Sequence, residues 1–250
     1  MLVRPGHIWS RQEVFEWLTD GLPPRTLVGL DLGASLPFID AGAFFPDWKD
    51  SPPDAKALWA LVDSICARDD HLSATSFVDH PDARDHFRRH GDRKGARFEG
   101  HGRLRETERE QRRQGLNPYS NFNLVGAAQV GKSSLTGMRV LHRLDGRLPI
   151  WPFDPPGNTT LVEIYTTIAA LAAGRAKGRA KMRSFEDLDA ALRALGSEPV
   201  PGAGAIDDHR SDALLSAAWL RTAAHRAELW HPAGLTPHIA ATEGWTFGVT

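Results

Sequence analysis

Four acidic residues have surroundings or spacings that predict a common chemistry. Asp31 and Glu163 each interrupt an apolar run that is typical of a buried strand. An isolated carboxylate in such a strand is costly unless a cation or several hydrogen-bond donors compensate it. Asp208 and Asp212 are four residues apart, the spacing that places two side chains on one face of a helix. If that helix packs across the ends of the two strands, the four carboxylates converge.

A set of three or four convergent carboxylates is what a pair of Mg²⁺ or Mn²⁺ ions requires. Such ions activate a water molecule and stabilise the leaving oxygen in phosphodiester hydrolysis. The sequence therefore predicts a divalent-metal site in which Asp31, Glu163 and Asp212 are catalytic and Asp208 is a further metal ligand. The simpler alternatives are a paired residue for each strand acid and, for Asp208, a charge that complements the helix dipole.

A second candidate motif is GAAQVGKS at residues 126–133, which matches the P-loop pattern G-x-x-x-x-G-K-[ST]. In a true P-loop, Lys132 would reach the terminal phosphates of a nucleotide and Ser133 would bind Mg²⁺. The motif lies at mid-chain, however, and no clean downstream apolar strand ends in the Asp that the metal needs. A nucleotide-binding protein or ATPase is therefore the alternative function. The simplest interpretation is a glycine turn with an exposed Lys132, which would lie near the substrate phosphate of the carboxylate site.

The elements that must position these residues are short strands interleaved with helices. Strands are expected at residues 26–33, 38–45, 72–78, 149–153, 160–165 and 244–249, with the first two paired as a hairpin. Helices are expected at residues 11–18, 53–67, 104–113, 135–144, 184–196 and 208–228. The pattern predicts an α/β domain at residues 26–250, after a helical extension at residues 1–25. Its sheet would be mixed, with five or six strands, and flanked by helices.

Two basic segments interrupt this pattern. Residues 84–114 contain eleven Lys or Arg and six Asp or Glu, so this insertion carries a net charge of about +5. In the second segment, residues 175–183, Lys and Arg alternate with small residues. Both segments could bind a phosphate backbone, which favours nucleic acid, either DNA or RNA, as the partner. The alternative is a solvated charged face, and a non-catalytic nucleic-acid-binding module is a third functional class.

Short sequences in order along the chain resemble domain-of-unknown-function family 429, whose members are predicted nucleases with a ribonuclease-H-like fold. They are VGLD at 28–31, VGK at 130–132, WPFD at 151–154, VEIY at 162–165, DAL at 212–214 and EGW at 243–245. In such folds one acid lies on the first strand, another on a later strand and the last on a C-terminal helix. The resemblance therefore implies these roles for Asp31, Glu163 and Asp212. The run GLDLGAS at 29–35 also resembles the first phosphate loop of actin-like and sugar-kinase ATPases, which share that core.

The composition bears on other classes of protein. The chain has 250 residues and a formal net charge of −1, and its single cysteine, Cys66, can form neither an internal disulfide nor a cysteine-rich zinc site. The first residues lack the apolar segment of a signal peptide, and no stretch approaches the roughly 18 apolar residues of a membrane span. The sequence therefore predicts a cytoplasmic protein without a membrane segment.

Overall fold

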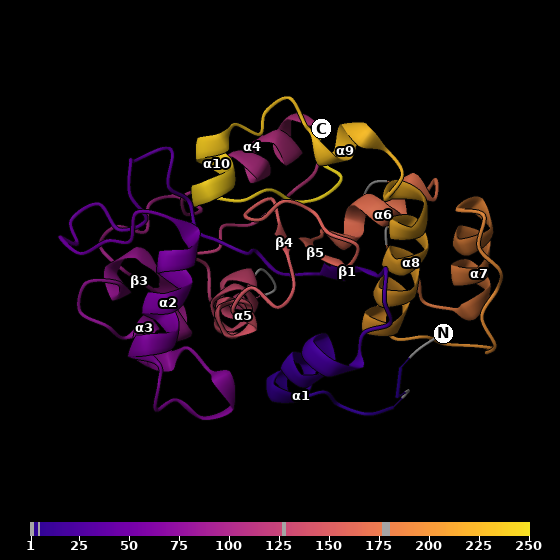
Figure 1. The fold of residues 1–250 in the computed structure, drawn as a ribbon, viewed down its shortest axis with the longest axis horizontal. Coiled ribbons are helices and arrows are strands. Elements are labelled where there is room, and N and C mark those ends of the chain that lie inside the picture. Colours follow the sequence, from indigo (N-terminus) through magenta and orange to yellow (C-terminus); the bar gives the residue numbers. More distant parts are fainter. Residues whose placement is uncertain (1–2, 5, 127–128, 177–180) are drawn as a thin grey trace.

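The centre of the molecule is a small parallel sheet, seen in a computed structural model that describes residues 3–4, 6–126, 129–176 and 181–250. The strand order is β1 (Leu27–Leu30), β5 (Thr160–Glu163) and β4 (Ile150–Trp151). β5 pairs in parallel with both neighbours, and Leu30 lies beside Glu163 at the carboxyl end of the ladder. Figure 1 shows this sheet between two groups of helices. The expected α/β class, with a sheet flanked by helices, is confirmed.

The sheet separates two hydrophobic cores. Successive side chains of a strand point to opposite faces, so Ile150 and Leu161 belong to the first core and Trp151 and Val162 to the second. Each face is stabilised by its own layer of helices, because apolar area removed from water contributes about 25 cal/mol per Å². Short strands can therefore form the centre of this molecule.

The first face of the sheet is covered by α5 (Val130–Leu144), which packs against α2 (Ala55–Ile65). Gly137 of α5 lies against Leu32, just beyond β1, where an added Cβ would be 2.5 Å from Leu32 Cδ2. A larger residue would require the side chain of Leu32 to shift. This side also carries α1 (Arg11–Glu16), which continues as a π-helical turn at Trp17–Gly21, and α3 (Thr75–Val78).

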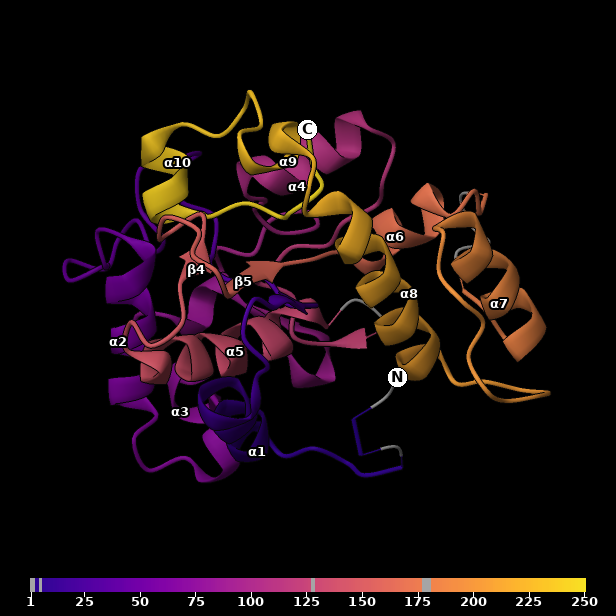
Figure 2. The same ribbon diagram turned by 45° about the vertical axis from the view of Figure 1, so that its right-hand side comes forward.

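The second face is covered by α6 (Thr166–Ala172) and α8 (Asp208–Ala223), with α7 (Phe185–Ala194) packed against α8. Figure 2 shows α7 at the edge of the molecule, beyond α8. Gly29 of β1 faces α8, and an added Cβ there would be 2.8 Å from Leu220 Cδ1. The glycine therefore allows α8 to lie close against β1.

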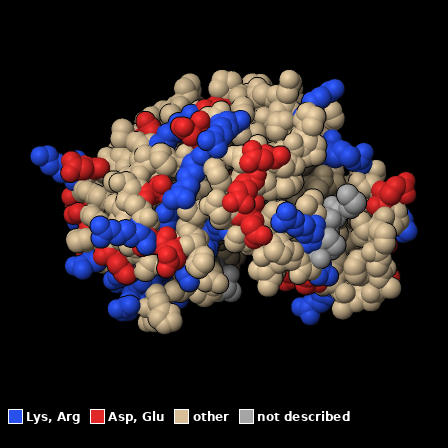
Figure 3. All heavy atoms as spheres, turned by 60° about the horizontal axis from the view of Figure 1, so that its bottom comes forward, with Lys and Arg blue, Asp and Glu red and all other residues tan. Residues whose placement is uncertain are grey.

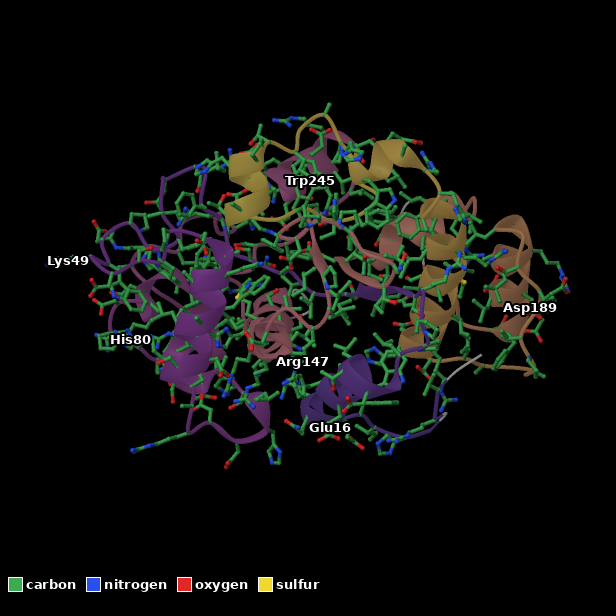
Figure 4. The ribbon with its side chains drawn as sticks, in the orientation of Figure 1. Glu16, Lys49, His80, Arg147, Asp189 and Trp245 are labelled. Carbon is green, nitrogen blue, oxygen red and sulfur yellow. The ribbon has the colours of Figure 1, made fainter. Side chains whose placement is uncertain are left out.

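The remaining elements surround this centre. Three short helices lie together at the top of Figure 1: α4 (Glu106–Arg113), α9 (Ala227–Trp230) and α10 (Pro237–Thr242). β2 (Arg88–Arg89) and β3 (Arg93–Lys94) form a separate antiparallel hairpin, and 3-10 turns occur at Asp70–Leu72, Arg84–His86 and His90–Asp92. Figure 4 shows Trp245 inside the molecule, whereas Lys49 and Asp189 lie at opposite ends.

The prediction of a mixed sheet with five or six strands is wrong for the described residues. Residues 38–45 form turns instead of a strand, and no hairpin joins them to β1 in the described part of the chain. Arg103 explains this difference. Its guanidinium donates to the carbonyl oxygens of Pro37, Ala43 and Phe44, so this segment satisfies backbone groups without a neighbouring strand.

Other boundaries are partly confirmed. The helices expected at residues 53–67, 104–113 and 184–196 are α2, α4 and α7, each slightly shorter. The strand expected at 72–78 is wrong, because that segment contains the helical turn α3. The expected closing strand at 244–249 is reduced to a single bridge between Thr246 and Glu163. The N-terminal helix packs on the first core through Val14 and Phe15.

The surface carries charges of both signs. On the face that Figure 3 brings forward, a run of Lys and Arg side chains lies beside a run of acidic ones. A formal net charge of −1 therefore says little about local charge. Among the helices that the structure describes, none is long and apolar enough to cross a membrane.

Candidate active site

The carboxyl ends of β1 and β5 lie at the same edge of the sheet because the two strands are parallel. Ligands of open parallel sheets usually bind at this edge. Asp31 follows the last residue of β1, and Glu163 is the last residue of β5. The register places Glu163 beside Leu30, so Asp31 lies one residue further along. Two of the predicted catalytic residues therefore reach the same edge.

Asp31 and Glu163 nevertheless belong to different sides of the sheet. Glu163 has the parity of Leu161, in the first core, whereas Asp31 has the parity of Gly29, which faces α8. Asp31 accordingly lines a cleft of about 760 Å³ together with Asp212 of α8. Glu163 lines a smaller hollow of about 150 Å³, which Asp31 also borders. Asp31 thus lies at the boundary between a closed side and an open side.

The cleft at Asp31 concentrates negative charge. Loss of hydration raises the pKa of Asp31 to about 6, although the residue is exposed at the surface, and the charges of Asp212 and Glu163 add to this rise. Burial, and then the charge of Asp208, raise the pKa of Asp212. His209, from the first turn of α8, opposes both shifts. Among the described residues, neither Asp31 nor Asp212 forms an ion pair.

Glu163 is fully bonded within the protein. The guanidinium of Arg105 donates to both carboxylate oxygens, over 2.5 Å to Oε1 and 2.8 Å to Oε2. The hydroxyl of Thr246 also donates to Oε1, over 2.6 Å, and the amide of Ala34 donates to Oε2 over 2.7 Å. Each oxygen accepts two hydrogen bonds, which occupies its lone pairs. In this arrangement, Glu163 has no free lone pair for a metal ion.

Arg105 is the N-cap residue of α4 and binds a second buried carboxylate, that of Glu108. Its Nε and Nη2 donate to Glu108 Oε1 over 2.9 Å and 2.5 Å. Burial disfavours the charge on Arg105, but Glu108 and Glu163 outweigh it and raise the pKa of the guanidinium. Burial also raises the pKa of Glu108 against the opposing charge of Arg105. The paired hydrogen bonds from Nε and Nη2 favour the ionised forms of Arg105 and Glu108, because hydrogen bonds between charged groups are strong.

A third carboxylate, Glu243, completes the buried cluster. Its oxygens accept hydrogen bonds from the amides of Phe38, Ile39 and Glu106, over 2.6, 2.8 and 2.6 Å. Because Glu106 is the first residue of α4, the charge of Glu243 also complements the dipole of that helix. The carbonyl oxygen of Glu243 accepts a hydrogen bond from Arg105 over 3.0 Å. The cluster therefore joins the sheet edge, α4 and the C-terminal segment.

The other predicted residues lie beside the Asp31 cleft. Asp208 pairs with Lys181, and that hydrogen bond lowers the pKa of Asp208. Lys132 is exposed in the first turn of α5 and lines a neighbouring hollow with Leu30 and Leu32. In the residues that the structure describes, no group of three or more His, Cys, Asp or Glu is arranged to hold a metal ion. The structure thus brings Asp31 and Asp212 together, while Glu163 is engaged by Arg105.

The P-loop match at residues 126–133 does not follow a strand of the central sheet. Residues 127–128 lie outside the described residues. Before them, Asn123 makes a single bridge to Arg88 of the separate hairpin. Gly131 has a packing role, since an added Cβ would be 2.1 Å from the carbonyl oxygen of Asn121. Close packing at the beginning of α5 therefore accounts for this glycine.

Much of the charge in the basic insertion is used within the fold. Arg103 binds Asp40 as well as three carbonyl oxygens, and Arg113 pairs with Glu110 at the surface of α4. In the second basic segment, residues 177–180 lie outside the described residues, and Arg175 pairs with Asp187. Residues 84–114 are therefore not one solvated face.

The sequence alone does not single out Arg105 and Glu243. Arg105 lies within the basic insertion, where ten other cations surround it in sequence. Glu243 belongs to the short EGW sequence. Its position before the buried Trp245 is a signal of the same kind as that of Glu163, a lone acid in apolar surroundings. The partner of such an acid lies far away in sequence and cannot be identified from spacing.

Three comparisons with known proteins were negative. No protein-family model matches the chain, no curated protein matches it, and no solved structure matches it. What the chain can bind is therefore inferred from the side chains at the carboxyl edge of the sheet.

Proposed function

We propose that this chain is a divalent-metal-dependent phosphodiesterase that cleaves nucleic acid in the cleft between Asp31 and Asp212. The observation that carries the proposal is the meeting of these two carboxylates across one cleft at the carboxyl edge of a parallel sheet. In the described part of the chain, neither carboxylate has an ion-pair partner. Two negative charges held close together attract a cation.

The donor set fits Mg²⁺ or Mn²⁺ bound in part by the substrate. Mg²⁺ usually keeps several water molecules and is held by one or two carboxylates together with substrate phosphates. Asp31 and Asp212 supply two carboxylates, and an open cleft of about 760 Å³ leaves room for water and a phosphate. When bound there, the ion would act as a Lewis acid toward the phosphodiester.

Glu163 has a positioning role in this proposal. Its carboxylate accepts a hydrogen bond from the amide of Ala34. The hydroxyl oxygen of Ser134 accepts a hydrogen bond from the amide of Gly33 over 3.1 Å. These two bonds fix the backbone that follows Asp31. Glu163 would therefore hold Asp31 in place, with its own charge neutralised by Arg105.

His209 is placed to handle a proton. It lies in the first turn of α8 and lines the same cleft as both carboxylates. An imidazole can accept a proton from an attacking water molecule at neutral pH. Asp31 and Asp212 would favour the protonated imidazole that results, because opposite charges stabilise each other.

We also propose a ribonuclease-H-like ancestry and kinship with family 429. What supports it is the order of the acids: the first follows the first strand, the second ends a neighbouring parallel strand, and the third lies on the last long helix. The three-stranded sheet is smaller than that fold requires, and the first strands are not paired as a hairpin in the described residues.

The proposal is tested by calorimetric titration of Mn²⁺ into the wild type and into Asp31→Asn and Asp212→Asn. We expect binding that both variants lose while they remain folded, since each removes one of two ligands. Asp208→Asn is the matched control, because it removes one carboxylate charge outside the proposed ligand pair, and it should still bind Mn²⁺.

Cleavage is then assayed on single- and double-stranded DNA and RNA with Mn²⁺ or with EDTA. We expect Mn²⁺-dependent cleavage of at least one of these polymers and its loss in Asp31→Asn. Wild-type protein that neither binds Mn²⁺ nor cleaves any of them contradicts the proposal. So does an Asp31→Asn variant with unchanged turnover.

A further inference from the structure

A cationic cleft lies beside the Asp31 site and takes no part in the proposed chemistry. Its volume is about 600 Å³, and it lies between α3, the β2–β3 hairpin and the first turn of α5. Four lining side chains carry positive charge, against one acidic residue, Asp79. The four are Arg11, Arg89, Arg93 and Lys132.

These cations retain capacity for an external acceptor. Arg89 pairs with Asp79 over 3.1 Å, but its Nε is buried and has no hydrogen-bond partner among the described residues. A buried donor without a partner costs free energy, so an acceptor that reaches it is favoured. Arg93 donates from Nε to the carbonyl oxygen of His90, and its terminal nitrogens have no partner among the described residues. Lys132 is exposed and forms no ion pair within the described part of the chain.

The beginning of α5 adds to the same potential. This helix has 15 residues, and its N-cap residue, Gln129, makes no capping hydrogen bond through its side chain within the described residues. The amino end of a helix carries a partial positive charge that favours anions. Gln129 and Lys132 both line the cleft, so this end of α5 faces it together with the four cationic side chains.

The cationic cleft continues toward the catalytic edge. A second hollow, of about 530 Å³, shares Arg11, Gln129, Lys132 and Thr136 with it. This second hollow also reaches Leu30 and Leu32, the residues on either side of Asp31. The two hollows together form a track, and the track meets the Asp31 cleft at Leu30, which lines both.

We propose that this track binds the sugar–phosphate backbone of a nucleic-acid strand and leads the strand to Asp31. The delivery of the strand to Asp31 for cleavage rests on the proposed function, whereas the binding of phosphates by the track does not. Phosphate oxygens suit the track because guanidinium and ammonium groups donate to them without regard to sequence. The strand would be held by charge, so affinity should fall steeply with salt concentration.

The test measures binding of a fluorescent oligothymidylate of about ten nucleotides, a length within the usual range for single-strand sites. It is done in EDTA, so that neither metal binding nor cleavage is needed. We expect Lys132→Gln and Arg93→Gln each to weaken binding roughly three- to tenfold and to reduce the salt slope by about one released ion or slightly less. Lys49 is exposed and lines neither hollow, so Lys49→Gln removes the same charge and should leave affinity unchanged.

Several outcomes would overturn the proposal. The track is not the binding surface if Lys49→Gln weakens binding as much as Lys132→Gln, or if the folded wild type does not bind at low salt. If ATP displaces the oligonucleotide at equal concentration and Lys132→Gln abolishes that competition, the cleft is a nucleotide site and the assignment to a strand is wrong. If binding follows the track but no Mn²⁺ is bound, the proposed function fails while this inference stands.

Discussion

Arg105 and Asp31 lie on two sides of the edge where β1 and β5 end, and charge is balanced differently around them. On the Arg105 side, three buried carboxylates accept hydrogen bonds from a guanidinium, backbone amides and the hydroxyl of Thr246. On the Asp31 side, Asp31 and Asp212 face an open cleft, and their pKa values are raised. The carboxylates of the first side are paired within the protein, whereas Asp31 and Asp212 form no ion pair among the described residues.

This difference separates two uses of the same side-chain type. A buried carboxylate whose lone pairs are all occupied joins distant segments, and removal of its partner leaves a buried charge. A carboxylate crowded against another at the surface lowers stability, a cost that proteins commonly accept at functional sites. Stability measurements on matched variants can therefore distinguish the two sides before any substrate is known.

The largest effect is expected for Arg105→Gln. This change leaves Glu163 and Glu108 buried without their cation, and it should lower the free energy of unfolding by about 3–5 kcal/mol. Urea unfolding at pH 7 measures the loss. Arg113→Gln, on the same helix, breaks an exposed pair with Glu110 and should cost less than about 1 kcal/mol. Equal losses in the two variants would show that the buried cluster is not a special contributor.

The next largest effect is the loss of folding stability at acid pH. His86, which belongs to neither the Arg105 side nor the Asp31 side, contributes to this loss. His86 is buried beside Phe45, and burial, then Arg103 and Arg97, lower the pKa of its imidazole to about 4. The unfolded state therefore binds a proton near pH 6.5, before the folded state does. Stability from the neutral imidazole is present above pH 6.5 and is lost as the pH falls toward 4, by on the order of 2–3 kcal/mol.

The check is a pair of urea titrations at pH 7.5 and pH 4.5 on the wild type and on His86→Phe. The variant should lose less stability on acidification, because it has no imidazole to protonate. If both proteins lose the same amount, acid sensitivity comes from the carboxylates. In that case, the pH dependence of the unfolding free energy directly compares the carboxylates of the Arg105 side with those of the Asp31 side.

The smallest effect is expected for Asp31→Asn, and its sign is what matters. Replacement of a crowded charge by a neutral amide should raise the free energy of unfolding at pH 7 by up to about 1 kcal/mol, after allowance for solvent screening. Glu163→Gln should instead lower it by about 1.5–3 kcal/mol, since charged hydrogen bonds are lost. Thermal and urea unfolding give both signs. A destabilised Asp31→Asn variant would mean that Asp31 is a structural residue.

Part of this arrangement follows from local sequence. The apolar run around Glu163 predicted a buried strand, and the spacing of Asp208 and Asp212 predicted a shared helix; both expectations are met by β5 and α8. The proximity of Asp31 to Asp212 also follows once those elements pack on one sheet. Local pattern succeeds in these places because strand and helix periodicity act over a few residues.

The rest depends on contacts between distant residues. Phe44 and Phe45 have the composition of a strand but lie fully buried in a turn segment, since Arg103, about 60 residues away, bonds the carbonyl of Phe44. Arg105 is 58 residues from Glu163, and nothing local distinguishes it from the other cations of residues 84–114. Pairing of a buried acid with one of eleven cations is settled by the three-dimensional packing.

The bonds of Glu243 have a consequence for the order in which the chain folds. This carboxylate accepts hydrogen bonds from the amide of Phe38, which is 205 residues earlier in the sequence, and from the amide of Glu106, which is 137 residues earlier. During synthesis, the turn segment that begins at Phe38 and α4 both emerge long before their shared acceptor does. The edge that carries Asp31 is therefore expected to close late and cooperatively, at the slow rate of contacts between distant segments.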